Sequence, residues 1–193
     1  MPTFIRLLLG MLAVLALPAH ANWYLDNESS RLSFVSTKNA ETSEVHRFLN
    51  LHGKVDPQGF AELRVEVDSV NTGIPLRDER LRRQLFDSKQ FPEAKITAQL
   101  DMRPITALAP GAQFELRLPL KVQLHGQSQT YSAELLATRL DERRFQVVTL
   151  EPLVLHAEDF DLLPGLERLR KEAGLSAVSF SVPVGAVLIF TAR

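Results

Sequence analysis

Residues 112–124 read AQFELRLPLKVQL, and their alternation decides the fold class. Every even position in this stretch holds an apolar residue, whereas every odd position holds a polar residue or a proline. Strict alternation over such a length is typical of a long β-strand with one buried face, or of two strands joined at a bend. Pro119 has no N–H for a neighbouring strand, so we expect an edge or a kink at this residue.

The same alternation recurs along the chain and predicts a mainly β protein. Turn signals such as Asp56-Pro57-Gln58-Gly59 and Ala109-Pro110-Gly111 separate the alternating runs. We therefore expect about eight to ten antiparallel strands, each with one apolar face, and such a sheet buries that face by closing into a barrel. The further expected strands cover residues 31–37, 45–55, 61–68, 94–102, 131–137, 145–155 and 178–190.

Two segments depart from the alternation and are predicted as short amphipathic helices. In Pro75–Phe86, acidic residues 78 and 79 each precede an arginine by four positions, which is the favourable order for ion pairs on a helix. Pro164–Ala173 begins with proline in its first turn and is followed by Gly174. We expect both helices to lie across the ends of the sheet.

Residues 1–21 are predicted to be a cleavable signal peptide, leaving residues 22–193 as a single domain. Arg6 precedes an apolar run over residues 7–17, and Ala19-His20-Ala21 supplies the small residues of a cleavage site. The alternative is a membrane anchor, but eleven residues form a helix of about 16 Å against a hydrocarbon core of about 30 Å. We therefore expect an exported protein that works outside the cytoplasm, without a stable membrane anchor.

The composition excludes several classes of function. The chain has no cysteine, so it has no disulfide, no thiolate metal site, no cysteine nucleophile and no lipoprotein attachment residue. After removal of residues 1–21 the chain keeps 21 basic and 23 acidic residues, with no basic block that would attract nucleic acid.

No arrangement of residues indicates catalysis, so we predict no catalytic residue, no metal and no cofactor. His46 and His52 would lie about 20 Å apart on one strand, too far for a shared metal ion, and each histidine is expected at the surface or a loop end. Asp159 and Asp161 would point the same way about 7 Å apart if their segment were extended, which is weak evidence for an acid–base pair.

The interior of the barrel is the remaining candidate site. A barrel of about eight strands is wide enough to be packed by its own side chains or to enclose one slender ligand. Small residues on the inward positions favour a cavity, although they also suit the taper of a packed core. These inward small residues are Ala98, Ala112, Ala133, Ala137 and Ala186.

One stretch of the chain resembles the hallmark of the YceI-like family. It runs from Val70 to Ile96 and includes Thr72, Arg77-Asp78, Phe86-Asp87 and Phe91-Pro92. The resemblance continues on both sides over most of residues 22–193. The flanking matches are Trp23-Tyr24-Leu25-Asp26, Ser33-Phe34, His52-Gly53 with Gly59, Val122–Gly126, Asp159-Phe160 and Val178–Phe190.

The resemblance implies an extended, lipocalin-like antiparallel barrel that is periplasmic and holds a polyisoprenoid chain, such as that of an isoprenoid quinone. Three positions depart from the family pattern. Arg80 replaces a histidine, Leu85 replaces the first of two phenylalanines, and Ala157-Glu158-Asp159-Phe160-Asp161 lacks the arginine and glycine of the family's Arg-x-Asp-Phe-Gly. The missing arginine and glycine affect the residues that would contact a ligand's head group.

The leading hypothesis is therefore a soluble binding protein for a long apolar ligand such as an isoprenoid lipid. The alternative is a packed barrel that binds partner proteins through its rim or its charged helix, and a homodimer through a strand edge stays open. An enzyme acting on a lipid or small molecule is the least favoured hypothesis. The residues predicted to line the lumen or its portal are Phe34, Leu81, Phe86, Phe91, Phe114, Leu116, Leu118, Phe180 and Val182.

Overall fold

Twelve strands form one continuous antiparallel sheet in the computed structural model, which describes residues 22–193. The predicted signal peptide, residues 1–21, lies outside the described residues. The strands are β1 (Trp23–Leu25), β2 (Arg31–Lys38), β3 (Thr42–Phe48), β4 (Leu51–Val55), β5 (Phe60–Glu66), β6 (Val70–Asn71), β7 (Glu93–Gln99), β8 (Gln113–Leu124), β9 (Gln127–Arg139), β10 (Arg144–Thr149), β11 (Leu153–His156) and β12 (Ser181–Ala192).

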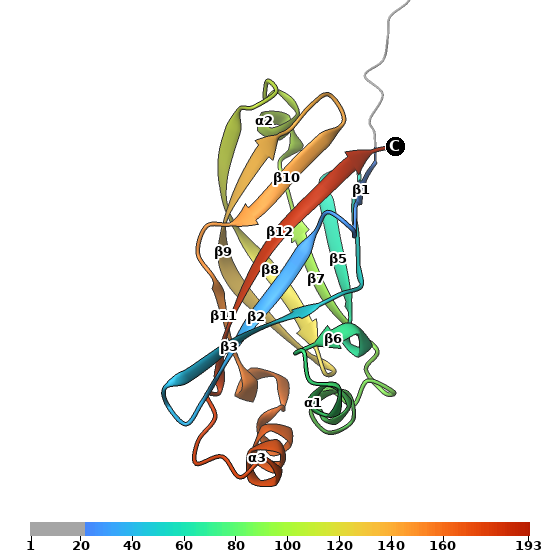
Figure 1. Ribbon diagram of the computed structural model, residues 1–193. Helices are drawn as coiled ribbons and strands as arrows, with labels where there is room; N and C mark the ends of the chain where they lie inside the picture. The colour runs from blue at the N-terminus through green and yellow to red at the C-terminus, as the bar shows by residue number, and fades with distance from the viewer. Residues whose placement is uncertain (1–21) are drawn as a thin grey trace, which may run out of the picture.

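The sheet closes on itself because β1 pairs with both β4 and β12. The closed ring runs through eight strands, in the order β1, β4, β5, β7, β8, β9, β10 and β12. On one side β12 pairs with β1 and β2 in turn, and on the other with β10 and β11 (Figure 1). The predicted mainly β barrel of about eight strands, closed and antiparallel, is confirmed.

β8 and β9 form the longest hairpin of the wall and explain the position of Pro119. Their register pairs twelve residues of each strand, from Gln113 opposite Thr138 to Leu124 opposite Gln127. On its other side β8 pairs with β7 only from Lys121 to Gln123. Pro119 therefore lies where β8 has a single neighbour, and its missing N–H leaves no unpaired carbonyl on a second strand.

Two segments that were predicted as single strands are each divided in two, and those predictions are wrong. Residues 45–55 hold the end of β3 and all of β4, separated at Leu49 and Asn50, where the backbone crosses to a different neighbour. Residues 145–155 contain β10 and β11, and the break includes Pro152, which cannot donate a ladder hydrogen bond.

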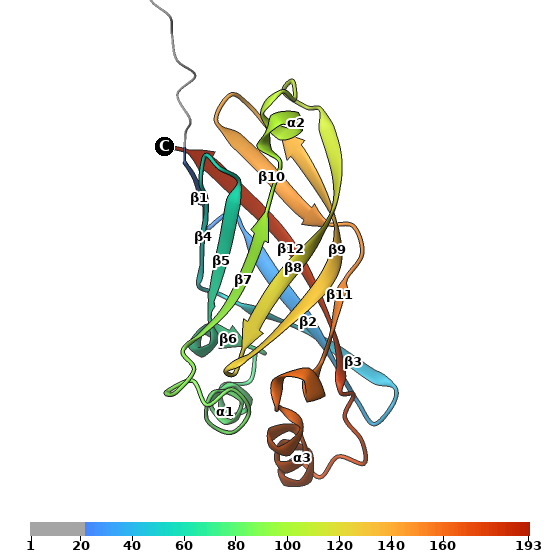
Figure 2. The same cartoon turned by 180° about the vertical axis from the view of Figure 1, so that it is seen from behind.

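Helices cover both ends of the barrel. The predicted helix over residues 75–86 is present as α1 (Pro75–Arg80) continued by the π-helical turn η2 (Leu81–Leu85), and α3 (Leu163–Glu172) matches the second prediction within one residue. Both lie at one end, and α2 (Met102–Thr106), which was not predicted, lies at the other (Figures 1 and 2). The short 3₁₀ turns are η1 (Val67–Ser69) and η3 (Ala157–Phe160).

The core is concentrated near the helical end and does not fill the barrel. One cluster, which includes Phe160, Val67 and Leu85, packs α3 and η2 against the strand ends. A smaller cluster around Leu51 and Val65 lies further along the wall. Within residues 22–193, every helix is too short or too polar to cross a bilayer.

Candidate functional site

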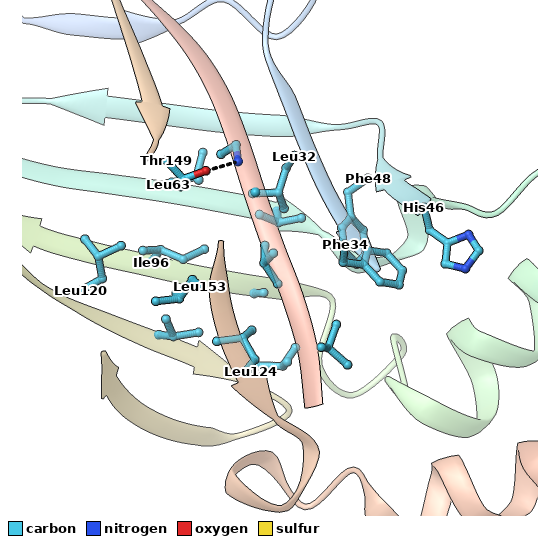
Figure 3. Close-up of a pocket in the computed structure, with 18 of the residues that line it drawn as sticks. Leu32, Phe34, His46, Phe48, Leu63, Ile96, Leu120, Leu124, Thr149 and Leu153 are labelled. Atoms are coloured by element: carbon cyan, nitrogen blue, oxygen red, sulfur yellow. Dashed lines mark hydrogen bonds between the residues drawn. The ribbon is translucent and has the colours of Figure 1, made fainter. Parts of the chain in front are cut away.

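The lumen of the barrel is hollow, with a cavity of about 540 Å³. This volume lies within the range of about 300–1,000 Å³ that is usual for ligand sites. Apolar side chains from opposite walls project into it, as Figure 3 shows for Leu32, Leu63, Ile96 and Leu120. The packed-barrel alternative required the lumen to be filled by its own side chains, and this cavity argues against it.

The pairing of large and small inward residues on neighbouring strands determines how much space the cavity has. Leu118 on β8 lies opposite Ala133 on β9, and Leu116 lies opposite Leu135. Ala133, Ala98 and Ala186 all line the cavity, so small inward residues leave space that leucine would fill. Ala112, by contrast, precedes β8 and does not line the cavity.

The middle of the cavity offers little to a polar ligand. Thr149 contributes a hydroxyl to the lining, and its Oγ1 already accepts a hydrogen bond from the Ala186 N–H at 3.1 Å (Figure 3). At the α2 end, Leu100, Met102 and Ile105 line the cavity. An apolar chain is therefore the kind of molecule that this part of the site suits.

Polar side chains gather at the other end, beside α1. Glu44 on β3 accepts hydrogen bonds from Lys38 Nζ at 3.1 Å and from Arg77 Nη1 at 2.7 Å. His46, two residues further along the same strand, shares a hydrogen bond of 2.8 Å between its Nε2 and Ser36 Oγ. These five residues all line the cavity and form its polar mouth.

Burial and charge perturb two groups of this polar mouth. The hydrogen bonds from Lys38 and Arg77 hold the pKa of the Glu44 carboxyl below its ordinary value. Burial lowers the pKa of His46, and the positive charge of Arg77 acts in the same direction. His46 is 4% exposed, so the prediction of a surface or loop-end histidine is wrong at this position.

α1 is fixed to the mouth by a buried carboxylate. Asp78 Oδ1 accepts hydrogen bonds from the Thr72 N–H at 2.9 Å and from Thr72 Oγ1 at 2.5 Å. Arg77 donates from Nε to Thr72 Oγ1 and from Nη2 to the Thr72 carbonyl, both at 2.8 Å. Asp78 therefore points inward instead of pairing with Arg82, whereas the predicted pair of Glu79 and Arg83 is present at 3.6 Å.

Six of the nine residues predicted for the lumen or portal line the cavity, and the other three lie elsewhere. Phe91 packs its ring on His125, with centroids 4.7 Å apart, and against Gly126. Phe114 shares the inward phase of β8 but lies beyond the lining residues, and Phe180 precedes β12 with 41% of its surface exposed. The six in the lining are Phe34, Leu81, Phe86, Leu116, Leu118 and Val182.

The polar mouth was not predicted, although the sequence carries a signal for it. Glu44, His46 and Phe48 share one phase of β3, and Phe48 and His46 both contact the ring of Phe34. When one side of a strand holds both an aromatic residue and polar residues, the strand is expected to leave the apolar core at its polar end. Figure 3 shows His46 beside Phe34, at the edge of the apolar lining.

Asp159 and Asp161 do not form a pair, because their segment is not extended. Asp159 lies in η3 and accepts a hydrogen bond from Tyr131 at 2.8 Å, whereas Asp161 accepts one from Gln127 at 2.5 Å. Burial, with the nearby Asp159 carboxylate, raises the pKa of Tyr131 to about 12. Over residues 22–193, no three histidine or acidic side chains are grouped so that they could hold a metal ion.

Comparison with known proteins agrees with the barrel fold over most of the chain. The model of the YceI-like domain matches residues 23–189. A polyisoprenoid binding domain from Saccharophagus degradans, implicated in plant cell wall breakdown, is 35% identical, with a TM-score of 0.87 over 89% of this chain and 98% of its own. None of the curated proteins that were compared matches the chain.

Two more distant structures share the fold. BcnA from Burkholderia cenocepacia is 20% identical, with a TM-score of 0.66 over 86% of this chain and 98% of its own. The YCEI protein of Campylobacter jejuni is 12% identical, with a TM-score of 0.54 over 77% of this chain and 84% of its own.

Proposed function

Because the chain belongs to the YceI-like family, we propose that it is a periplasmic binding protein that holds a long apolar ligand in the barrel lumen. The observation that carries the proposal is the hollow, leucine-lined cavity of about 540 Å³. An isoprenoid lipid is the ligand we favour, since the Saccharophagus degradans relative is a polyisoprenoid binding domain. The protein binds this ligand and carries out no reaction on it.

Apolar burial is a sufficient source of affinity for such a ligand. A chain that removes about 400 Å² of apolar surface from water gains about 10 kcal/mol at about 25 cal/mol per Å², before the entropic cost of association. This gain needs no polar recognition, so the lumen selects for length and slenderness. The polar mouth is then the place where a head group contributes further selectivity.

The direct test is to identify what the purified protein contains. Mature protein, residues 22–193, is extracted with organic solvent and the extract is analysed by mass spectrometry, before and after incubation with a prenyl lipid. We expect one apolar molecule per protein. A protein that stays empty under both conditions would contradict the proposal.

A lumen-filling variant separates binding in the cavity from adsorption to the surface. Ala186 lines the cavity, whereas the next residue, Val187, is 38% exposed on the outer face of β12. Ala186→Phe is expected to lower ligand content at least tenfold because the added ring occupies the lumen. Val187→Phe is the matched control and should keep the ligand content of the unmodified protein.

The proposed location is tested by fractionation. Expression of the whole chain in a Gram-negative host should give periplasmic protein whose N-terminal sequence begins at Asn22. Protein that stays in the cytoplasm with an intact Met1 would overturn this part of the proposal.

A further inference from the structure

We propose that the helical end of the barrel docks reversibly on an anionic lipid bilayer and inserts the lip formed by Ile74 and Leu76. The inference rests on the proposed function, because a route for an apolar chain into the lumen matters only if the lumen binds such a chain. It identifies the surface through which the ligand enters and leaves. The partner is the bilayer itself.

The lip is an apolar surface continuous with the cavity. Ile74 is 49% exposed and Leu76 is 62% exposed, and both side chains also line the cavity. Among the large apolar side chains exposed in residues 22–193, these two alone belong to the cavity lining. Single exposed apolar residues are ordinary on protein surfaces, but a pair at the mouth of an apolar cavity marks the route of a ligand.

The helical segments beside this lip hold more basic than acidic residues. Residues 73–90 and 163–174, which hold α1, η2 and α3, contain eight basic and five acidic residues. The rest of residues 22–193 contains 13 basic and 18 acidic residues, so the positive excess is confined to the helices. Arg83, Lys89, Arg168 and Lys171 are exposed there.

The neighbouring turn η3 adds acidic charge beside α3 through Glu158, Asp159 and Asp161, but none of these side chains lines the cavity. The segment that carries the lip, residues 73–90, keeps its own excess, with five basic and three acidic residues. An apolar lip flanked by arginine and lysine is the arrangement by which peripheral proteins bind anionic membranes. A protein partner would not need the apolar side chains to continue into the lumen, so we favour the bilayer.

Vesicle flotation tests the docking. Mature protein is mixed with vesicles of phosphatidylcholine alone, or with phosphatidylcholine and about one third phosphatidylglycerol, and the floated fraction is measured. We expect binding to the anionic vesicles only, with a loss of about tenfold when salt is raised from about 0.05 M to 0.5 M. Absence of binding to anionic vesicles at low salt, or equal binding to both kinds, would overturn the proposal.

Matched charge reversals locate the docking surface. Arg83 is 72% exposed and lies 3.6 Å from Glu79, whereas Arg117 on the outer face of β8 is 75% exposed and lies 3.5 Å from Glu134. Arg83→Glu should weaken vesicle binding about tenfold, and Arg117→Glu should leave it unchanged. If both variants lose vesicle binding equally, the net charge of the protein attracts it to the vesicles, and this result would contradict a docking face.

A second pair of variants tests the lip. Leu76→Glu should lower vesicle binding about tenfold, because a carboxylate replaces the inserted leucine. Phe60, 45% exposed beside the β4–β5 turn at the opposite end, supplies the control Phe60→Glu (Figure 2). If both variants bind vesicles as the unmodified protein does, the lip is not inserted.

Solvent extraction of the same preparations keeps the two proposals distinguishable. Arg83→Glu protein that still contains ligand but no longer floats supports docking. Unmodified protein that contains ligand yet does not float refutes docking and leaves the proposed function intact. Unmodified protein that floats but holds no ligand refutes the proposed function alone.

Discussion

His46 is the residue of the polar mouth whose charge depends most on the fold. Its pKa is lowered in the folded protein by burial and by Arg77, while Glu44 and Asp78 act weakly in the opposite direction and Lys38 adds to the lowering. A histidine with a lowered folded pKa binds a proton more readily when unfolded. Its neutral form therefore supports stability fully above pH of about 6.5, and this support is lost as the pH falls below that value.

We predict that His46→Gln weakens the pH dependence of stability. The free energy of unfolding, measured with urea between pH 5 and pH 8, should fall less steeply on acidification in the variant than in the unmodified protein. His52→Gln is the control, because His52 is half exposed and bound to Glu66 at 2.8 Å. Identical profiles for the unmodified protein and His46→Gln would contradict this account.

Asp78 gives a second prediction at the residue scale. Its carboxylate is 5% exposed and accepts both the N–H and the hydroxyl of Thr72. Asp78→Ala leaves these donors without their acceptor and should cost about 1–3 kcal/mol of the free energy of unfolding. Glu79→Ala removes the neighbouring acid, whose side chain is 50% exposed, and should cost less than about 0.5 kcal/mol.

At the scale of elements, the contact between α3 and η2 depends on a single glycine. A Cβ built on Gly165 would lie 2.6 Å from the carbonyl oxygen of Gln84 and 3.1 Å from the Cα of Leu85. The two helical segments therefore approach each other through backbone atoms at this point. Arg80, the last residue of α1, and Glu172 of α3 add an ion pair of 3.7 Å beside this contact.

We predict that Gly165→Ala separates α3 from η2. Steric overlap with backbone atoms should cost about 1–3 kcal/mol, measured as a lower denaturation midpoint, and should increase hydrogen exchange in residues 81–85 and 163–172. Gly185→Ala is the control, because its nearest atom would lie at 3.6 Å, an ordinary contact. A stability of Gly165→Ala equal to that of the control would show that the helices adjust freely.

The strand predictions were right where the inward residues stay on the same alternating positions, all even or all odd. They were wrong where the inward residues change from even to odd positions. β8 keeps its apolar residues on even positions throughout, so its bounds were predicted within one residue. Between β3 and β4 the inward phase changes from Glu44, His46 and Phe48 to Leu51 and Val55, and the strand break lies at this change. α2 is only five residues long, too short for a helical period to appear in the sequence.

The lining was predicted less completely than the strands, for a geometric reason. Alternation shows which side of a strand faces inward, but not how far along the strand the cavity extends. Phe114 has the inward phase of Leu116 and yet lies beyond the cavity. Phe91 was predicted from the family resemblance, and it packs instead on the His125-Gly126 turn, where a Cβ on Gly126 would lie 3.0 Å from its ring.

At the scale of the whole molecule, a filled lumen should make the barrel more stable. A ligand that binds the folded protein alone adds about 2.7 kcal/mol at a concentration one hundred times its Kd. For a domain of this size, that corresponds to a rise in Tm of about 5–10 °C. Thermal denaturation with increasing prenyl lipid should show this rise, and Ala186→Phe should not; a Tm that does not depend on lipid would argue against binding to the folded state.

The closing strand of the ring also determines when the chain can finish folding. Trp23 pairs with Ala192, so the first and last strands of the barrel meet across nearly the whole sequence. The β8–β9 hairpin joins at the two-residue turn His125-Gly126 and can form early, whereas the β1–β12 seam requires the closure of a very long loop. A chain still under synthesis therefore stays open along this seam until its last twelve-residue strand is released.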